Sequence, residues 1–580
     1  MPNVKENNVS RRDFLGFAGG LISFASLASL GADANFKQNI IKVDNNKMTN
    51  ENISTDVLVI GSGMAGLFAA IKAHDAGANV IMVSKGRLGT SGQTPFAKGI
   101  FSYDEKKETL SVEDFVDKVS RSALGTNNKN YTRQLAEHSK ARVEELREWG
   151  FFDSPLCNAP FSKPILKRNI PLLERVMITH LLKVDGKIAG AMGFSLNDEK
   201  IITIKAKSVI LCTGAGGFKP NGFPICDLTH DGSIMAYEIG AKITGKEWND
   251  GHPGSVTNAA NTFGNWHGMF EQKPSTTTVH INHHLGVDLN YMAYKTGNSV
   301  KMGPPGMMIT DATKVVGGPY TPPEFQQQDG PPREGKEGDS KPPREREQPP
   351  GMSSNPVGGS SAGLSIHKSE GLVPINDRCE STIKGLYAAG DALGSYMSGG
   401  IYTQIGSSLA GSAVQGAIAG EEAALFAATI EMPNVSKEYL ATIEAQILAP
   451  LKREAGYSPA WITQALQGIM IPNFVLYIKK ERMLQAALSY VEELKQSHLP
   501  YIKASDVHEL RLAHETYNMI ISAQMKLKAS LMRKESRCSH FRLDYPNIDN
   551  ENWQAWINIY KDNAGEMAFE KQPFGTWATL

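Results

Sequence analysis

The sequence lacks the cysteine patterns that would hold an iron–sulfur cluster or a covalently attached haem. Its five cysteines are scattered, and none belongs to a C-x-x-C or C-x-x-C-H motif. His280, His283 and His284 lie close together but without the alternation of a metal-binding strand. We therefore predict a chain with no metal site and no cluster or haem of its own.

Two further features of the sequence are the absence of net charge and a segment without apolar side chains. Lys plus Arg and Asp plus Glu number 60 each, so bulk charge gives no reason to expect nucleic acid or an anionic membrane as partner. Residues 326–350 contain no aliphatic or aromatic side chain, and the stretch 319–356 is rich in proline. Such a segment cannot bury enough apolar surface to order itself, so 319–356 is predicted to be a disordered insertion. A proline-rich docking ligand is the alternative.

Long hydrophobic runs are also missing, apart from one near the N-terminus. Arg11 and Arg12 precede the apolar stretch 14–30, and small residues follow at 32–34. This order is typical of a twin-arginine export signal, which carries folded proteins across a membrane. We predict a signal peptide over 1–34, the twin-arginine export machinery as a partner, and a periplasmic or extracytoplasmic location. An uncleaved N-terminal anchor is the alternative.

A glycine-rich turn follows the first predicted strand. An apolar run at 55–60 leads into G-x-G-x-x-G, a helical pattern at 64–77 and a second apolar run at 79–84. In such a β-α-β unit the glycines permit a tight turn and let the backbone approach a pyrophosphate at the helix N-terminus. The predicted phosphate-binding residues are Gly61, Ser62, Gly63, Met64, Ala65 and Gly66.

The end of the second predicted strand carries Ser84 and Lys85 in place of the acidic residue that usually holds a ribose hydroxyl. This position leaves FAD and NAD both open. Two later stretches favour FAD: TGAGG with Thr213 and Gly214, and GLYAAGDALGS, where an apolar run ends at Asp391. A small-residue helix that begins near Ser407 and Ser408 could aim its N-terminus at the flavin.

Three ordered motifs make the chain resemble the FAD-binding fumarate reductase/succinate dehydrogenase flavoprotein superfamily, whose members include aspartate oxidase and the adenylylsulfate reductase flavoprotein. They are TSGQTPFAKGI at 90–100, GLYAAGD at 385–391 and MRKESRCSHFRLDYP at 532–546. The resemblance implies FAD as cofactor, flavin contacts from Ser91, Gly92 and Gly99, and hydrogen bonds from the flavin ribityl chain to Asp391. A flavoprotein that folds around a cytoplasmic cofactor must leave the cell folded, which agrees with the paired arginines.

The same resemblance implies an α/β fold built in several parts. We expect a two-dinucleotide-binding-type FAD domain, an inserted α+β capping domain and a C-terminal helical domain. The predicted limits are a linker at 35–54, the FAD domain at 55–239 and 358–430, the cap at 240–357, the helical domain at 431–545 and a tail at 546–580. The charged residues of 533–542 are interpreted as an ion-pair lock between the helical and FAD domains.

The chain departs from the family pattern at three places. Gly92 stands where some relatives have the histidine that bonds covalently to flavin, so we predict non-covalent FAD. The run 396–411 has no arginine where relatives carry a substrate arginine, and 250–253 alone resembles the substrate histidine motif. Carboxylates are normally held by bidentate arginine. Fumarate and succinate are therefore unexpected substrates, and Tyr402 and His252 are the candidate catalytic acid or base.

The predicted function is that of an exported FAD-dependent oxidoreductase. It would move hydride between flavin N5 and an activated C–C bond of a small substrate. Because the chain has no other redox centre, it needs an external electron carrier: a c-type cytochrome, a quinol dehydrogenase or an iron–sulfur protein. The alternatives are a flavoprotein subunit that relays electrons within a larger complex, and an FAD-binding module without activity.

Overall fold

The fold is taken from a computed structural model that does not describe every residue. The described residues are 48–219, 225, 227–249, 254–255, 271–279, 281, 356–357, 370–400, 403–471, 473–476 and 478–579. They belong to the unit Val43–Leu580, and the other unit, Met1–Lys42, lies outside them. The predicted export signal, nearly all of the proline-rich stretch, His252 and Tyr402 also lie outside the described residues.

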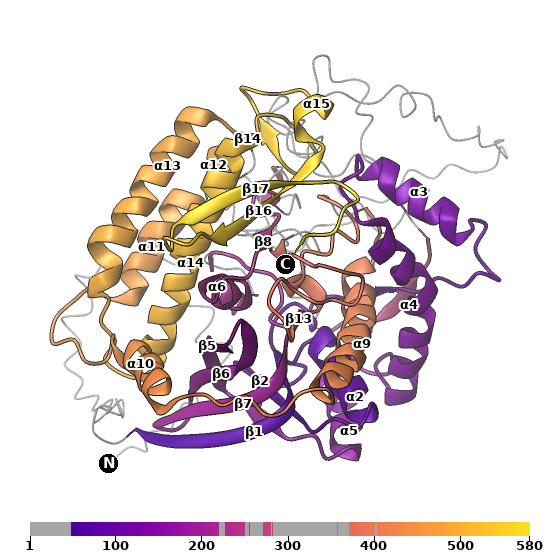
Figure 1. The fold of residues 1–580 in the computed structure, drawn as a ribbon. Coiled ribbons are helices and arrows are strands. Elements are labelled where there is room, and N and C mark those ends of the chain that lie inside the picture. Colours follow the sequence, from indigo (N-terminus) through magenta and orange to yellow (C-terminus); the bar gives the residue numbers. More distant parts are fainter. Residues whose placement is uncertain are drawn as a thin grey trace, which may run out of the picture. The chain divides into compact units, whose positions relative to one another are not determined.

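A seven-stranded sheet forms the centre of the fold (Figure 1). Its order is β4-β2-β1-β7-β6-β5, with β13 paired to β7. The pairs β1/β2, β1/β7, β2/β4 and β7/β13 are parallel, whereas β5/β6 and β6/β7 are antiparallel. The strands are β1 (Thr49–Ile60), β2 (Val80–Ser84), β4 (Leu172–Glu174), β5 (Val176–Val184), β6 (Lys187–Ser195), β7 (Lys200–Leu211) and β13 (Leu386–Ala388). This arrangement confirms the predicted α/β class.

The limits of the first strand differ from the prediction. We expected a linker up to residue 54, but β1 begins at Thr49 and pairs with β7 from there on. The polar residues 49–52 lie on the exposed end of the strand, where backbone pairing needs no apolar side chain. Two apolar runs separated by Asp185 and Gly186 predict a hairpin with its turn at these residues. The structure confirms it, and both residues have the positive φ that a two-residue turn of this kind requires.

Helices α2 (Met64–Asp75) and α9 (Ser407–Ala427) pack closely beside the sheet. A Cβ atom at Gly416 would lie 2.3 Å from the Ala65 carbonyl oxygen, and one at Gly420 would lie 2.4 Å from that of Ala69. The glycines thus let two helix backbones touch, which brings both helix N-termini to the same edge of the sheet. The neighbouring helices are α3 (Val112–Ser122), α4 (Lys129–Trp149) and α5 (Asn158–Lys167).

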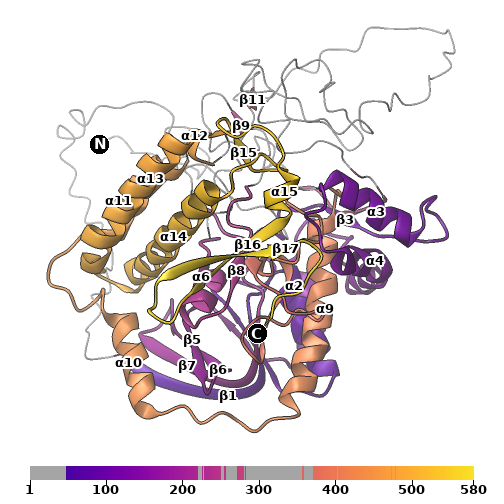
Figure 2. The ribbon, with the colours of Figure 1, turned by 45° about the horizontal axis from the view of Figure 1, so that its top comes forward.

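A bundle of helices from the C-terminal half lies on the side of the molecule away from α2 and α9 (Figures 1 and 2). The sequence predicts one long amphipathic helix over 506–535, and the structure confirms it as α14, which Asp506 caps by accepting a hydrogen bond from the Glu509 N–H. Leu484, Ala487 and Val491 recur at helical spacing in the sequence, and all three are buried on the helix before it. The bundle contains α10 (Lys437–Leu448), α11 (Pro459–Met470), α12 (Asn473–Leu476), α13 (Glu481–Glu493) and α14 (Val507–Met532).

The predicted C-terminal tail is wrong, because residues 546–580 contain a strand pair that completes a second sheet. Its order is β12-β8-β16-β17. Residues 555–559 of β16 are all buried, with Ile557 and Ile559 fully so, so both faces of this part of the strand are covered. The elements are α6 (Asp231–Glu238), β8 (Ile243–Thr244), β12 (Gly371–Leu372), α15 (Asn550–Trp553), β16 (Ala555–Lys561) and β17 (Met567–Pro573).

Short elements complete the described chain. β3 pairs with β10 in parallel, β9 with β11 antiparallel, and β14 with β15 in parallel. Their bounds are β3 (Gly99–Phe101), β9 (Gly254–Ser255), β10 (Ser275–Thr277), β11 (Pro356–Val357), β14 (Ile478–Lys479) and β15 (Phe541–Arg542), with 3-10 turns at Gly390–Ala392 and Leu499–Tyr501 and a π-helical turn at Leu494–His498.

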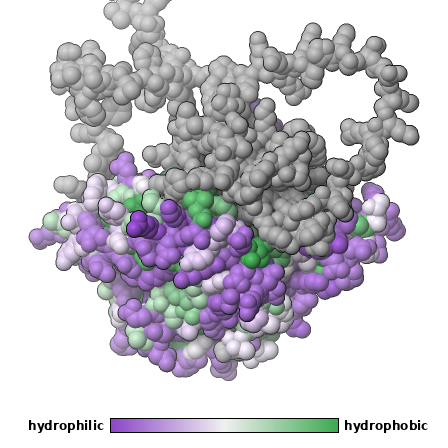
Figure 3. Space-filling model, turned by 90° about the horizontal axis from the view of Figure 1, so that it is seen from above, coloured by the Kyte–Doolittle hydropathy of each residue, from purple (hydrophilic) through white to green (hydrophobic). Residues whose placement is uncertain are grey.

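The surface offers little contiguous apolar area where it can be seen. On the face in Figure 3 the coloured residues are largely hydrophilic, with small hydrophobic spots. None of the helices among the described residues has the length and apolarity that crossing a membrane requires.

Candidate active site

The glycine-rich turn between β1 and α2 has the geometry of a phosphate-binding loop. Gly61 has φ +114°, and a Cβ atom there would lie 2.1 Å from the Cys212 carbonyl oxygen. A Cβ atom at Gly66 would lie 1.9 Å from the Gly61 carbonyl oxygen. No other residue fits at either position, because the turn, the helix and β7 touch backbone to backbone. Gly66 therefore acts in helix packing and does not line the pocket.

Gly63 differs from the other two glycines. Its φ of −77° suits any residue, and an added Cβ atom would meet only the Thr94 hydroxyl oxygen, at 3.2 Å. It thus leaves open space beside the first turn of α2, which contains no acidic residue. The positive end of the helix is available to an anionic ligand. The arrangement fits the pyrophosphate of a dinucleotide.

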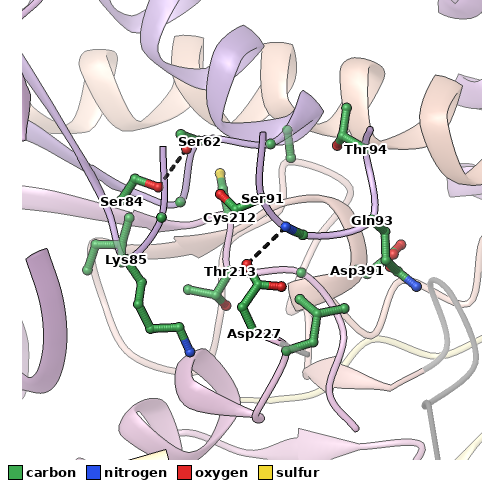
Figure 4. A pocket seen from close by; sticks show the side chains of 18 of the residues that line it. Ser62, Ser84, Lys85, Ser91, Gln93, Thr94, Cys212, Thr213, Asp227 and Asp391 are labelled. Atoms are coloured by element: carbon green, nitrogen blue, oxygen red, sulfur yellow. Dashed lines mark hydrogen bonds between the residues drawn. The ribbon is translucent and has the colours of Figure 1, made fainter. Parts of the chain in front are cut away.

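A pocket extends from this turn across the carboxyl ends of the parallel strands (Figure 4). It contains about 980 Å³ of space free of protein atoms, counting the part open to solvent. The carboxyl edge of a parallel sheet is the usual place for such a site. The predicted cofactor residues that line it are Gly61, Ser62, Gly63, Met64, Ala65, Ser84, Lys85, Ser91, Gly92, Thr213, Gly214, Asp391 and Ser408.

Two predicted cofactor residues lie elsewhere, in addition to Gly66. Gly99 begins β3 and pairs with Ser275 of β10. Ser407 is fully buried, and its hydroxyl lies 3.2 Å from that of Ser398. Neither lines the pocket, although Ser408, the next residue, does.

At the end of β2 the two predicted residues have different orientations. The hydroxyl oxygens of Ser62 and Ser84 face each other at 2.6 Å, whereas the Lys85 side chain runs away from them along the pocket wall (Figure 4). The Lys85 ammonium donates to Thr229, Asp231 and Glu515 at 3.1, 2.6 and 2.9 Å. All three of its protons are thus used within the protein, so the stem of Lys85 and not its charge faces the ligand.

Sequence reasoning predicted Asp391 but missed the two other acidic residues of the pocket, Asp227 and Asp231. Asp227 accepts a hydrogen bond from the Gly92 N–H at 3.0 Å (Figure 4). Asp231, at the start of α6, lines the same wall as Ser84 and Lys85. The available signal was the polar run DLTHDG at 227–232, which follows the TGAGG turn. Thr94 was also missed, and its hydroxyl oxygen accepts a hydrogen bond from the Met64 N–H at 3.1 Å.

Asp391 marks the other end of the pocket, where β13 ends. Its carboxylate accepts a hydrogen bond from the Ser408 hydroxyl at 3.4 Å. The preceding Gly390 N–H donates to the Gln415 side-chain oxygen at 3.1 Å. The first turn of α9 contains no acidic residue. A carboxylate and an electropositive helix end therefore face the pocket together, which fits the ribityl chain and the electron-accepting edge of a flavin.

A charged junction connects α14 and the segment after it with the elements around β8. Arg533 contacts Glu247 and Glu535 at 2.9 Å each, and Arg537 contacts Glu535 at 2.8 Å. All of these side chains are buried. Arg537 also donates to the carbonyl oxygen of Leu124, 3.2 Å away in the FAD-binding half. The predicted cluster of ion pairs is present, but these pairs join the segment after α14 to itself and to Glu247, within the predicted cap. Its contact with the FAD-binding half at Leu124 is a hydrogen bond and not an ion pair.

Further buried charges continue this junction. Glu370 accepts hydrogen bonds from Lys526 at 2.6 Å and from Lys246, and His230 lies 3.1 Å from it. Burial and the charge of Lys526 lower the pKa of Lys246 to about 8, although the charge of Glu370 acts in the opposite direction. Burial and Lys246 lower the pKa of His230 to about 4. We use "charged junction" for both groups: Lys246, Glu370, Lys526 and His230 with Glu247, Arg533, Glu535 and Arg537.

The described residues contain no group of three or more His, Cys, Asp and Glu arranged to hold a metal ion. His280, His283 and His284 lie outside them. Cys212 is buried, as expected of a residue in an apolar strand.

Comparison with known proteins agrees with this geometry. The FAD binding domain family matches residues 56–163, and the fumarate reductase flavoprotein C-terminal family matches residues 463–577. An uncharacterized FAD-dependent oxidoreductase of Methanocaldococcus jannaschii is 26% identical, over 90% of this chain and 99% of that protein. One of the subunits of the fumarate reductase (CoM/CoB) of Methanothermobacter marburgensis is also 26% identical, over 88% and 98%.

A solved structure shows the same fold. The FrdA chain of E. coli quinol fumarate reductase superimposes with a TM-score of 0.67 at 18% identity, over 91% of this chain and 98% of that chain. The pocket, the two family matches and these relatives agree on FAD as the cofactor. The chain is an FAD-dependent oxidoreductase that contains the FAD binding domain and the fumarate reductase flavoprotein C-terminal domain, and over nearly its whole length it is similar to fumarate reductase flavoproteins.

Proposed function

We propose that this protein exchanges hydride between FAD and an activated C–C bond of a small substrate that is not a dicarboxylate. Bound FAD supplies the hydride chemistry at its N5 atom. The observation that carries the exclusion is the pairing of the buried arginines. Arg533 and Arg537 contact Glu247 and Glu535, and Arg542 contacts Asp544 at 2.8 Å.

Each of these guanidinium groups is already neutralised within the protein. A dicarboxylate needs free guanidinium groups to offset the desolvation of two charges. The run 396–411, where relatives carry a substrate arginine, contains no charged residue, and its described part from Tyr396 to Gly400 is buried. A less charged substrate such as an enone or a monocarboxylic enoate suits these surroundings better.

Residues of the chain itself bind the cofactor, orient it and supply the proton. The turn at 61–66 and the first turn of α2 bind the phosphates, and Asp391 with the N-terminus of α9 orients the reacting half of the cofactor. Gly92 offers no side chain for a covalent flavin bond, which supports non-covalent FAD. The proton is assigned to Tyr402 or His252. The nearest described residues before and after Tyr402, Gly400 and Thr403, are both buried.

The test is an anaerobic oxidation screen. The purified protein is reduced with dithionite or viologen, and enones, enoates, sulfur oxyanions and fumarate are added in turn. We expect reoxidation by enones or enoates, and little reaction with fumarate. Tyr402→Phe and His252→Gln should slow that reoxidation while leaving the flavin spectrum unchanged. Prompt reoxidation by fumarate would refute the exclusion of dicarboxylates.

A second candidate function is electron relay within a larger complex. The support is that a relative that aligns over 98% of its length is named as one of the subunits of fumarate reductase (CoM/CoB). The partner would be an iron–sulfur protein, a c-type cytochrome or a quinol dehydrogenase. In the same assay, reoxidation only by a co-purifying redox protein favours this alternative over direct turnover.

We further propose that the protein is exported in folded form by the twin-arginine machinery to the periplasm. The support is the pair Arg11 and Arg12 ahead of an apolar stretch. Changing both to lysine should retain flavin-loaded protein in the cytoplasm. Unchanged distribution between cell fractions would contradict export by this route.

A further inference from the structure

Helix α14, which belongs to the C-terminal bundle, contacts the residues that form one wall of the FAD pocket. Glu515 and Asn518 lie three positions apart on α14, so their side chains share one face of the helix. Glu515 is fully buried and Asn518 is 7% exposed. Their partners, Lys85 and Asp231, both line the pocket.

The contacts form a closed network. The Glu515 carboxylate accepts from the Lys85 ammonium at 2.9 Å, and the Asn518 amide donates to the Asp231 carboxylate at 2.9 Å. Lys85 and Asp231 contact each other at 2.6 Å, and Thr229 donates to Asp231 at 2.7 Å. The two wall residues are therefore fixed both to each other and to α14.

The charges of this network depend on one another. Burial disfavours the charge of Lys85, but Asp231 and Glu515 outweigh burial and raise its pKa. Burial also disfavours the carboxylate of Glu515, yet Lys85 and Lys219 outweigh burial and lower its pKa to about 2. Lys219 contacts Glu515 at 2.5 Å. Removal of Glu515 would leave the partly buried ammonium groups of Lys85 and Lys219 without the carboxylate that they share, which would strain the wall.

We propose that Glu515 and Asn518 are positioning residues for FAD, so that docking of α14 and binding of the cofactor are thermodynamically coupled. The end of β2 is where a dinucleotide fold holds a ribose, and in this chain Ser84, Lys85 and Asp231 occupy that place. Asp231 keeps acceptor capacity beyond its three donors, because a carboxylate has about four acceptor positions. α14 fixes this carboxylate for a ribose hydroxyl without touching the ligand.

The test compares ligand affinities of the apoprotein and its variants at a temperature where all are folded. Flavin is removed, and dissociation constants for FAD, ADP and FMN are measured by fluorescence or calorimetry. Glu515→Gln should weaken FAD and ADP about tenfold, and Asn518→Leu about threefold, with FMN unchanged because it has no adenosine. In the double variant the FAD affinity should fall by less than the product of the two single-variant factors, because both residues act through the same wall residues.

The matched control is Glu492→Gln, which removes a carboxylate from the same bundle. Glu492 contacts only the partly exposed Lys528, at 3.7 Å, among the ion pairs of the described residues, so ligand affinities should not change. A purely structural role for Glu515 and Asn518 would lower the melting temperature and leave the three dissociation constants as in the wild type. That result, or equal weakening of FMN and ADP, would overturn the proposal. Should Glu515→Gln fail to fold, Asn518→Leu decides alone.

Discussion

The phosphate-binding turn of the FAD pocket presents backbone groups and glycines, whereas the charged junction is filled by long ionised side chains. In the pocket, Gly61 and Gly63 bring the main chain to the surface of the cavity. In the junction, Arg533 and Glu535 are fully buried and satisfy each other. The pocket thus keeps donors available for a ligand, while the junction uses its charges to hold the parts of the chain together.

This difference explains how a protein of near-zero net charge can bind a polyanionic cofactor. The positive potential comes from helix N-termini and aligned N–H groups, which need no charged side chain. The junction's cations are neutralised locally and contribute little to ligand binding. Substitutions in the two regions should therefore have separable effects, on affinity in one and on stability in the other.

The largest effect is expected from Gly61→Ala. A Cβ atom at 2.1 Å from the Cys212 carbonyl oxygen, on a residue with φ +114°, cannot be accommodated without moving β7. We expect loss of bound flavin and of most soluble protein, measured by the visible spectrum and the yield. Gly77→Ala is the control, because Gly77 has a positive φ but open space around it, and it should cost only about 1 kcal/mol. Similar behaviour of the two variants would contradict the close packing of the turn.

Arg533→Met should destabilise the protein by about 3–5 kcal/mol, because it leaves Glu247 as an uncompensated buried charge and removes one of the two arginines that pair with Glu535. Urea denaturation of the holoprotein measures this change. The FAD dissociation constant, measured where the variant is folded, should stay within twofold of the wild type. The control is Arg378→Met, whose partner Glu422 forms an exposed pair worth at most about 1 kcal/mol. A large loss of FAD affinity in Arg533→Met would show that the two regions are not separable.

His230 makes the junction sensitive to acid. Its pKa is lowered from 6.5 to about 4 in the folded protein. Between pH 4 and pH 6.5 the imidazole is therefore protonated in the unfolded chain and neutral in the folded protein. The stability contributed by neutral His230 is complete above pH 6.5 and is lost toward pH 4, by about 1.4 kcal/mol per pH unit. His230→Asn, which tolerates the positive φ of this position, should flatten the pH dependence of the urea midpoint. His138→Asn, at an exposed histidine of α4, is the control and should leave that pH dependence as in the wild type.

The smallest effect on stability, and the sharpest on the cofactor, is expected from Gly63→Ala. The added methyl group meets only the Thr94 hydroxyl, so the unfolding free energy of the apoprotein should change by less than about 1 kcal/mol. The same methyl group occupies the space beside the first turn of α2, so FAD should bind at least about tenfold more weakly, equivalent to about 1.4 kcal/mol. Urea denaturation of the apoprotein measures the first quantity, and calorimetric titration with FAD measures the second. Wild-type affinity would mean that the phosphates lie elsewhere.

Local patterns predicted the parts of the site that depend on local geometry. The glycine spacing identified the turn at 61–66, Asp185 and Gly186 identified a hairpin, and an apolar run ending in Asp391 identified the far end of the pocket. In each case neighbouring residues must share one backbone conformation, so the sequence alone contains the information. The same holds for α14, with its cap at Asp506.

Long-range pairing could not be predicted in this way. Lys85 was expected to face the ligand, yet its charge is directed to Glu515, 430 positions away in sequence. The start of β1 at Thr49 depends on backbone pairing with β7, and the strand pair at the C-terminus depends on β8. Such contacts are decided by how distant elements meet, and no spacing within one segment records them.

The most direct test of the account is the fate of the flavin when the purified protein is precipitated with acid. A pocket built from backbone donors, with Gly92 in place of a covalent histidine, predicts a yellow protein that releases one FAD per chain into the supernatant and leaves a colourless precipitate. A colourless protein that does not take up added FAD, or a precipitate that retains the flavin, would contradict it.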